Sequence, residues 1–168
     1  MSVVRFSLQT PSLPVFIPAI LLGQIDVDET AYSITMEYNG FEFKKNIKYV
    51  PADLTQPIPN PPLTSQDLTS KYYYVFSYQQ WIRMINTAFT DCFAGLLALT
   101  PLPTANPPFM EFNIDSQLAI INADELGYNQ ALPIPIKIFF NTALHTLYNS
   151  FQFNRLGYGN TTNGKTSN

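Results

Sequence analysis

The dipeptide Asn39-Gly40 limits the fold of this chain more than any other feature. It joins two extended runs in the stretch AYSITMEYNGFEFKKNIKYV, residues 31–50. Asn-Gly tolerates the positive φ angles of a type I′ turn, whose twist matches that of two paired antiparallel strands. We therefore predict a β-hairpin over residues 31–50, and with it an antiparallel sheet.

Further runs typical of strands lie on both sides of this hairpin. Residues 3–8 and 15–23 are rich in β-branched and aromatic residues and are separated by Pro11 and Pro14. Residues 109–113 and 117–123 flank the short stretch IDS and predict a second hairpin, and residues 134–140 predict one more strand.

The hydrophobic period changes to that of a helix after Ser77, which is a suitable N-cap. Apolar residues recur at helical spacing and should face a sheet: Trp81, Met84, Ile85, Ala88, Cys92, Leu96 and Leu97. Polar residues lie mostly on the other side: Gln80, Arg83, Asn86, Thr87, Thr90 and Asp91. Pro101 follows the predicted end.

A shorter helix is predicted after Asn141 as N-cap, with Ala143, Leu144, Leu147, Tyr148 and Phe151 on its apolar side. The fold class is therefore α+β: antiparallel β-hairpins packed with one long and one shorter amphipathic helix, linked by Pro-rich extended connectors.

The tripeptide Asn-Thr-Ala occurs twice, at 86–88 and 141–143. The first copy should lie inside the long helix and the second at the start of the short one. Because the flanking residues show no matching order, shared helix patterning or coincidence explains the pair better than an internal duplication.

Two Pro-rich segments are predicted to be extended arms, at 51–70 and 98–108. Residues 51–70 carry five prolines, among them Pro57, Pro59, Pro61 and Pro62. A polyproline segment loses little entropy on binding, so such an arm can fasten onto a neighbouring subunit, although a loop crossing its own domain is the alternative. We expect one compact domain over 1–155 and, over 156–168, a flexible polar tail or a linker to a downstream domain.

The sequence offers no set of residues for catalysis, and we predict no enzyme, no cofactor and no metal site. His145 is the single histidine, and Cys92, the single cysteine, lies on an apolar helix side where a buried thiol is expected. The acidic stretch DVDET, residues 26–30, lacks the glycine and glutamate of a calcium loop and predicts a solvated turn, with a weak divalent-cation or interface contact as the alternative. Asp and Glu residues are spread along the chain, which gives a glycoside hydrolase no support.

The charges also argue against nucleic acid and membrane partners. The net charge is -3 and the nine basic residues are scattered; the densest stretch, FKKNIK at 43–48, fits the solvated side of a strand. The apolar runs 15–23 and 93–103 are short and broken by proline, and the first residues lack the pattern of a secretory signal. A single cysteine fits folding in the cytoplasm.

An aromatic cluster, KYYYVFSYQQW at 71–81, leads from a strand into the long helix. Alternate residues of such a segment point outward, so Tyr72, Tyr74, Tyr78 and Trp81 are candidates for contacts with another subunit, together with the prolines of 57–62. A platform that stacks on a sugar or a base is the alternative for this cluster.

Composition brings these features together. Charged residues make up 12% of the chain, about half the usual share, and aromatic residues 14%. With its Pro-rich arms and without a catalytic set, the chain resembles subunits of viral capsids in composition. The resemblance implies a self-assembling structural protein of the virion, folded in the host cytoplasm, whose partners are copies of itself or other virion proteins. A soluble carbohydrate- or peptide-binding module is the alternative function.

Overall fold

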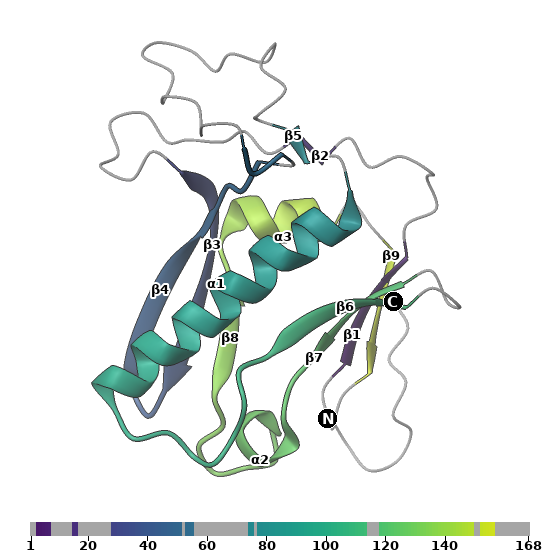
Figure 1. Ribbon diagram of the computed structural model, residues 1–168. Coiled ribbons are helices and arrows are strands. Elements are labelled where there is room, and N and C mark those ends of the chain that lie inside the picture. The colour runs from purple at the N-terminus through teal and green to yellow at the C-terminus, as the bar shows by residue number, and fades with distance from the viewer. Residues whose placement is uncertain are drawn as a thin grey trace.

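The computed structural model of the protein describes residues 3–7, 15–16, 28–51, 53–55, 74–75, 77–113, 118–149 and 152–156. Its strands form antiparallel sheets of four, three and two strands, and α1 (Tyr78–Leu99) is the long helix. α1 lies across the three-stranded sheet and passes beside β6, the first strand of the four-stranded sheet (Figure 1). The predicted α+β class with one long and one shorter helix is confirmed.

The three-stranded sheet contains the predicted Asn-Gly hairpin. β3 (Glu29–Tyr38) pairs with β4 (Phe41–Lys48) on one side and with β8 (Lys137–Phe140) on the other. Asn39 has a φ of 50° and Gly40 a φ of 82°, as a type I′ turn requires. Ile34 and Met36 of β3 are fully buried, so one side of this sheet forms the core.

The four-stranded sheet has the order β6-β7-β1-β9. β6 (Phe109–Asn113) and β7 (Leu118–Asn122) are the second predicted hairpin, and β1 (Val3–Ser7) confirms the first predicted strand. Its last strand, β9 (Gln152–Leu156), was not predicted, and Leu156 belongs to this strand rather than to the tail. β2 (Val15–Phe16) and β5 (Tyr74–Val75) form the two-stranded sheet.

α1 begins and ends as predicted. The Ser77 side chain accepts a hydrogen bond from the Gln80 N–H at 3.1 Å, and the Thr100 N–H donates to the Leu96 carbonyl at the other end. At Gly95 the helix approaches β4 so closely that a Cβ atom would overlap the Phe43 ring. A side chain at this position would therefore push the helix away from the sheet.

Two residues of α1 differ from the prediction. Gln80, expected on the polar side, is 4% exposed, and its Nε2 donates to the Val50 carbonyl at 2.7 Å. Leu97, expected on the apolar side, is 52% exposed because it lies about 100° around the helix axis from the fully buried Leu96. Phe89, absent from the predicted set, is fully buried, and its ring centroid lies 6.5 Å from that of Phe140 in β8.

The short helix α3 (Thr142–Asn149) follows β8 as predicted, with Leu144 fully buried and Tyr148 6% exposed. Phe151, predicted on the same side, lies outside the described residues. A further one-turn helix, α2 (Glu125–Tyr128), was not predicted; the Asp124 side chain caps it by accepting from the Leu126 N–H.

Both Asn-Thr-Ala copies lie where they were expected, and both asparagines bind the backbone of a strand. Asn86 accepts from the Met110 N–H at 2.6 Å and donates to the Met110 carbonyl at 2.9 Å, so it occupies the outer edge of β6. Asn141 caps α3 by accepting from the Leu144 N–H at 3.1 Å. It also accepts from the Ser33 N–H and donates to the Ala31 carbonyl, where β3 extends beyond the end of β8.

The predicted arm at 98–108 lies partly against its own chain. Residues 98–99 complete α1, and Leu102 and Ala105 of the connector pack against the core of their own chain. The Asn106 amide also donates to the Asp124 carboxylate. The other predicted arm, 51–70, is described only at 51 and 53–55.

Candidate assembly surfaces

Among the candidate contact residues Tyr72, Tyr74 and Tyr78, the structure describes the side chain of Tyr78. Tyr78 begins α1, and its ring stacks on Phe112 of β6, with ring centroids 4.9 Å apart and an interplanar angle of 13°. The ring is partly exposed, and burial of the rest raises the pKa of its phenol. Tyr78 therefore presents a fixed aromatic surface where α1 meets the four-stranded sheet.

Trp81 was also assigned to a subunit contact, but it is 6% exposed and packs in the core of its own chain. Its ring meets Tyr32 edge-on, with centroids 5.8 Å apart. The exposed area of Trp81 is therefore too small to anchor a second subunit. Tyr74 pairs with Phe16 through the backbone of β5 and β2. Tyr72, Pro57, Pro59, Pro61 and Pro62 lie outside the described residues.

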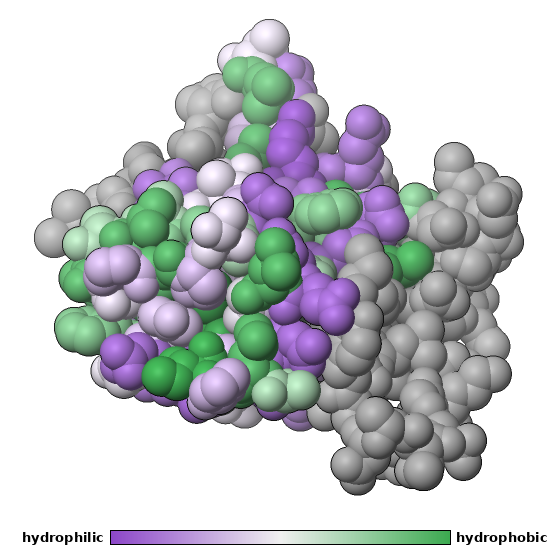
Figure 2. All heavy atoms as spheres, turned by 90° about the horizontal axis from the view of Figure 1, so that it is seen from below, coloured by the Kyte–Doolittle hydropathy of each residue, from purple (hydrophilic) through white to green (hydrophobic). Residues whose placement is uncertain are grey.

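Several exposed apolar side chains come from segments at one end of the molecule, which the sequence did not predict. They come from the β3–β4 turn, the end of α1, α2 and the turn before β8, which lie together at the lower end of Figure 1. We call this surface the apolar end; its residues, between 47% and 66% exposed, are Phe41, Leu97, Leu99, Leu126 and Ile134. Figure 2, which views the molecule from below, shows apolar residues spread over this face with hydrophilic ones between them.

The side of the three-stranded sheet turned away from α1 has a different character. Thr35, Glu37 and Lys44 alternate with the buried residues of their strands, and the Lys137 ammonium lies 3.2 Å from a Glu37 carboxylate oxygen. Phe139, opposite Thr35 in the register, is 46% exposed on this polar surface. The apolar end is thus distinct from the polar side of the sheet.

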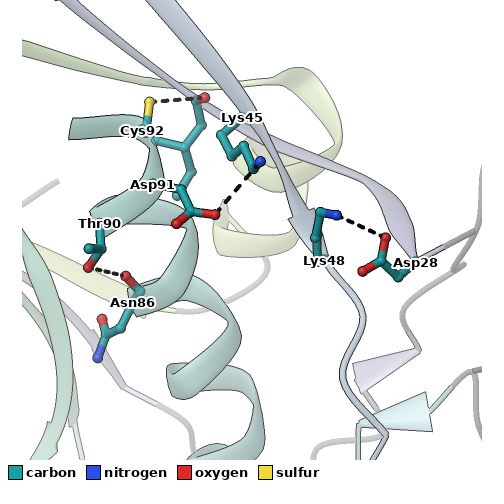
Figure 3. A network of polar contacts seen from close by, with 8 residues as sticks. Asp28, Lys45, Lys48, Asn86, Thr90, Asp91 and Cys92 are labelled. Atoms are coloured by element: carbon teal, nitrogen blue, oxygen red, sulfur yellow. Dashed lines mark hydrogen bonds and ion pairs between the residues drawn. The ribbon is translucent and has the colours of Figure 1, made fainter. Parts of the chain in front are cut away.

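The lysines of residues 43–48 are partly engaged within the chain (Figure 3). The Lys45 ammonium lies 3.7 Å from the Asp91 carboxylate on α1, and Lys48 lies 3.3 Å from Asp28. The stretch is a strand, as the sequence predicted, but only Lys44 is fully solvated, while Lys45 and Lys48 lie beside acidic neighbours.

Cys92 has the environment of a core residue. It is fully buried, and its thiol donates to the Phe43 carbonyl at 3.0 Å (Figure 3). Burial raises the pKa of this thiol to about 11, which keeps it protonated at neutral pH and unsuited to nucleophilic attack. His145 lies on the exposed side of α3. The described residues include no group of three or more His, Cys, Asp or Glu side chains placed to hold a metal ion.

α1 is long and apolar enough to cross a membrane, but a core helix passes the same test. Its apolar side, including Met84, Ile85 and Leu96, is buried in the core.

The comparison with known families identifies the class of protein. Residues 1–168 match the model of the family described as Sputnik minor capsid protein V18/19. The chain belongs to this family. It is also 37% identical over 104 residues to the V18 protein of Sputnik virophage, an alignment that covers 58% of this chain and 62% of V18.

A solved structure extends the likeness to the fold. A chain in the 3.5 Å cryo-EM structure of the Sputnik virophage superposes with a TM-score of 0.69 at 30% identity. The match covers 97% of this chain and 46% of that one, so the V18/19-family chain spans about half the length of its structural relative. The prediction of a capsid or virion structural protein is confirmed at the level of the family.

Proposed function

We propose that this V18/19-family chain is a building unit of a viral shell, folded in the host cytoplasm, that works by binding neighbouring shell proteins, copies of itself among them, and catalyses no reaction. The match of the whole chain to a minor capsid family carries the proposal. The small share of charged residues, 12% of the chain, supports the proposal, because charged residues are depleted at the cores of protein interfaces.

The tyrosine cluster remains part of the proposed interface. Tyr78 is partly exposed and fixed against Phe112, which lowers the conformational entropy that an aromatic anchor loses on binding. Tyr72 and Tyr74 shortly precede Tyr78 in the sequence, and the prolines of 57–62 belong to the predicted arm at 51–70. We assign all of them to the same contact. Trp81 is left out, since it is buried within its own chain.

The test is to count copies of the chain in purified virus particles by quantitative mass spectrometry, before and after a high-salt wash. A building unit should be present in a fixed number of copies that the wash does not remove, because contacts with apolar and aromatic cores survive salt screening. A chain that is absent, or that is lost in the wash, would contradict the proposal.

The contact residues are tested in the same particles. Tyr72→Ser and Tyr78→Ser should lower the number of incorporated copies, whereas Tyr38→Ser, a partly buried tyrosine outside the cluster, should not. Equal incorporation of all three variants would remove the tyrosine cluster from the interface without removing the chain from the shell.

A further inference from the structure

We propose that the outer edge of β4 is a docking site for an added strand, supplied by the polypeptide that corresponds to the part of the Sputnik structural relative beyond the match. Whether that polypeptide continues the same chain or is a separate protein makes no difference to the contact. The inference rests on the proposed function and adds to it the contacting strand and the partner.

Every second residue of β4 turns its backbone N–H and carbonyl away from β3. The two-residue turn makes Tyr38 and Phe41 a hydrogen-bonded pair, and the register continues from it without a shift as far as residue 46. Alternation then points the backbone groups of three residues outward: Glu42, Lys44 and Asn46. The Ile47 carbonyl belongs to the inward set and accepts from the Thr30 hydroxyl on β3 at 2.6 Å, as this alternation requires.

The outer edge of β4 is open in the described part of the chain. β4 comes first in the strand order β4-β3-β8, and it borders the molecule at the left of Figure 1. Among the described residues, no hydrogen bond reaches the outward backbone groups of Glu42, Lys44 or Asn46. β4 is eight residues long and contains no proline, so neither of these common devices keeps another strand away.

Two other strand edges are closed by asparagine side chains. Asn86 bonds both backbone groups of Met110 on the outer edge of β6. Asn141 bonds β3 beyond the end of β8, which itself has four residues. β4 is the longest edge strand among those described, and no side chain closes it. A long open edge invites indiscriminate pairing in a free protein, so we infer that a strand covers it in the assembled one.

The length of the structural relative indicates which polypeptide supplies that strand. The match covers 97% of this chain and 46% of the relative, so more than half of the relative lies beyond the body that the two proteins share. A sheet of three strands is also small, since most sheets have about five or six. An open edge accepts an extended segment through main-chain hydrogen bonds, while the neighbouring side chains select the sequence.

The side chains along the edge define what the added strand should carry. Glu42 and Lys44 are exposed, and among the described residues neither forms an ion pair, whereas Lys45 lies beside Asp91. Opposite charges on directly facing residues stabilise a strand pair, and like charges destabilise it. We therefore expect an acidic residue opposite Lys44 in the added strand, and a basic or amide residue opposite Glu42.

The edge can be blocked without breaking the β3–β4 hairpin. In Lys44→Pro the lost N–H is one that points outward, so the hydrogen bonds to β3 remain while an added strand loses its donor. Lys44→Thr is the matched control, because it removes the same charge and keeps the N–H. Glu42→Pro is a second variant that removes another outward N–H, and urea unfolding followed by circular dichroism establishes that each variant is folded.

Incorporation into virus particles is the first measurement. Lys44→Pro should enter particles in at least about tenfold fewer copies than Lys44→Thr, because each hydrogen bond that the added strand cannot make weakens the contact. Equal incorporation of Lys44→Pro, Glu42→Pro and Lys44→Thr would overturn the inference.

The second measurement identifies the partner in particles of the unaltered virus. The amides of Glu42, Lys44 and Asn46 should exchange hydrogen at least about a hundredfold more slowly in particles than in the 168-residue chain in solution. An amine-reactive cross-linker should join Lys44 to a peptide similar in sequence to the unmatched part of the relative.

Two results of these measurements would contradict the proposed contact: exchange as fast in particles as in solution, or cross-links from Lys44 only to another copy of residues 1–168 or to an unrelated shell protein. A chain present in a fixed number of copies with a fast-exchanging β4 edge would overturn this inference alone. A chain missing from the particles would overturn the proposed function itself.

Discussion

Replacing Asn86 by Ala should destabilise the fold far more than its place on a helix surface suggests. The Asn86 amide binds both the N–H and the carbonyl of Met110, at 2.6 and 2.9 Å, and thereby pairs the outer edge of β6 with α1. Met110 is 2% exposed, so water cannot easily replace the amide. Each buried group left without a partner costs about 1–3 kcal/mol, and the loss of both should lower the free energy of unfolding by about 2–4 kcal/mol.

The assay is urea unfolding followed by circular dichroism, with Thr87→Ala as the control. Thr87 is the next residue of α1, is exposed, and its hydroxyl donates to the Arg83 carbonyl of its own helix. Its replacement should change the free energy of unfolding by no more than about 0.5 kcal/mol. If Asn86→Ala cost no more than Thr87→Ala, the argument that Asn86 completes the edge of β6 would be wrong.

An Asn86→Asp variant separates the two bonds. Its carboxylate still accepts from the Met110 N–H but faces the Met110 carbonyl with negative charge instead of a donor. Protonation would restore a donor, so this variant should recover stability as pH falls, relative to the unaltered chain. A loss that did not change with pH would contradict this assignment.

Three further outcomes follow from single positions. Gly40→Ala should lower the free energy of unfolding by about 1–2 kcal/mol, through its positive φ alone, because an added Cβ meets nothing within 4 Å; an unchanged urea midpoint would contradict this. Asn141→Ala should lower the free energy of unfolding by about 2–4 kcal/mol, and Asn141→Ser should recover only about 1 kcal/mol of it by restoring the helix cap. If Asn141→Ser were as stable as the unaltered chain, the hydrogen bonds of Asn141 to β3 would contribute nothing to stability. When the pH rises from 9 to 11, the free energy of unfolding should fall more in the unaltered chain than in the Cys92→Ala variant, because the thiol has a pKa near 9.0 in the unfolded chain and of about 11 when buried. An equal fall in both proteins would contradict this prediction.

Local signals in the sequence predict much of this fold. The Asn39-Gly40 turn, the Ser77 cap and the Asn141 cap depend on neighbouring residues only, and all three were found where expected. The buried thiol of Cys92 follows in the same way from helical spacing. These features are encoded within a few positions of the residue concerned.

The differences arise where distant segments meet. Gln80 is buried because the Val50 carbonyl needs a donor, and no pattern within the helix contains that information. Gly95 matters through Phe43, which precedes it by some fifty residues. β9 pairs with β1 across almost the whole chain, so its residues give no local sign of a strand partner.

The candidate surface was missed for the same reason. Phe41, Leu97, Leu126 and Ile134 come from four separate segments, and each alone is an ordinary exposed apolar residue. Only the fold brings them to one end. The tyrosine cluster, by contrast, is visible as a run of sequence, but the fold places Trp81 in the core.

The central claim, that this chain acts through contacts in a viral shell, is tested most directly by hydroxyl-radical footprinting of virus particles against the free chain in dilute solution. We predict that Leu97, Leu99 and Tyr78 react in the free chain and are protected in particles, while the buried Cys92 is protected in both. The same labelling pattern in particles and in the free chain would contradict the account, because the candidate assembly surfaces would then remain uncovered.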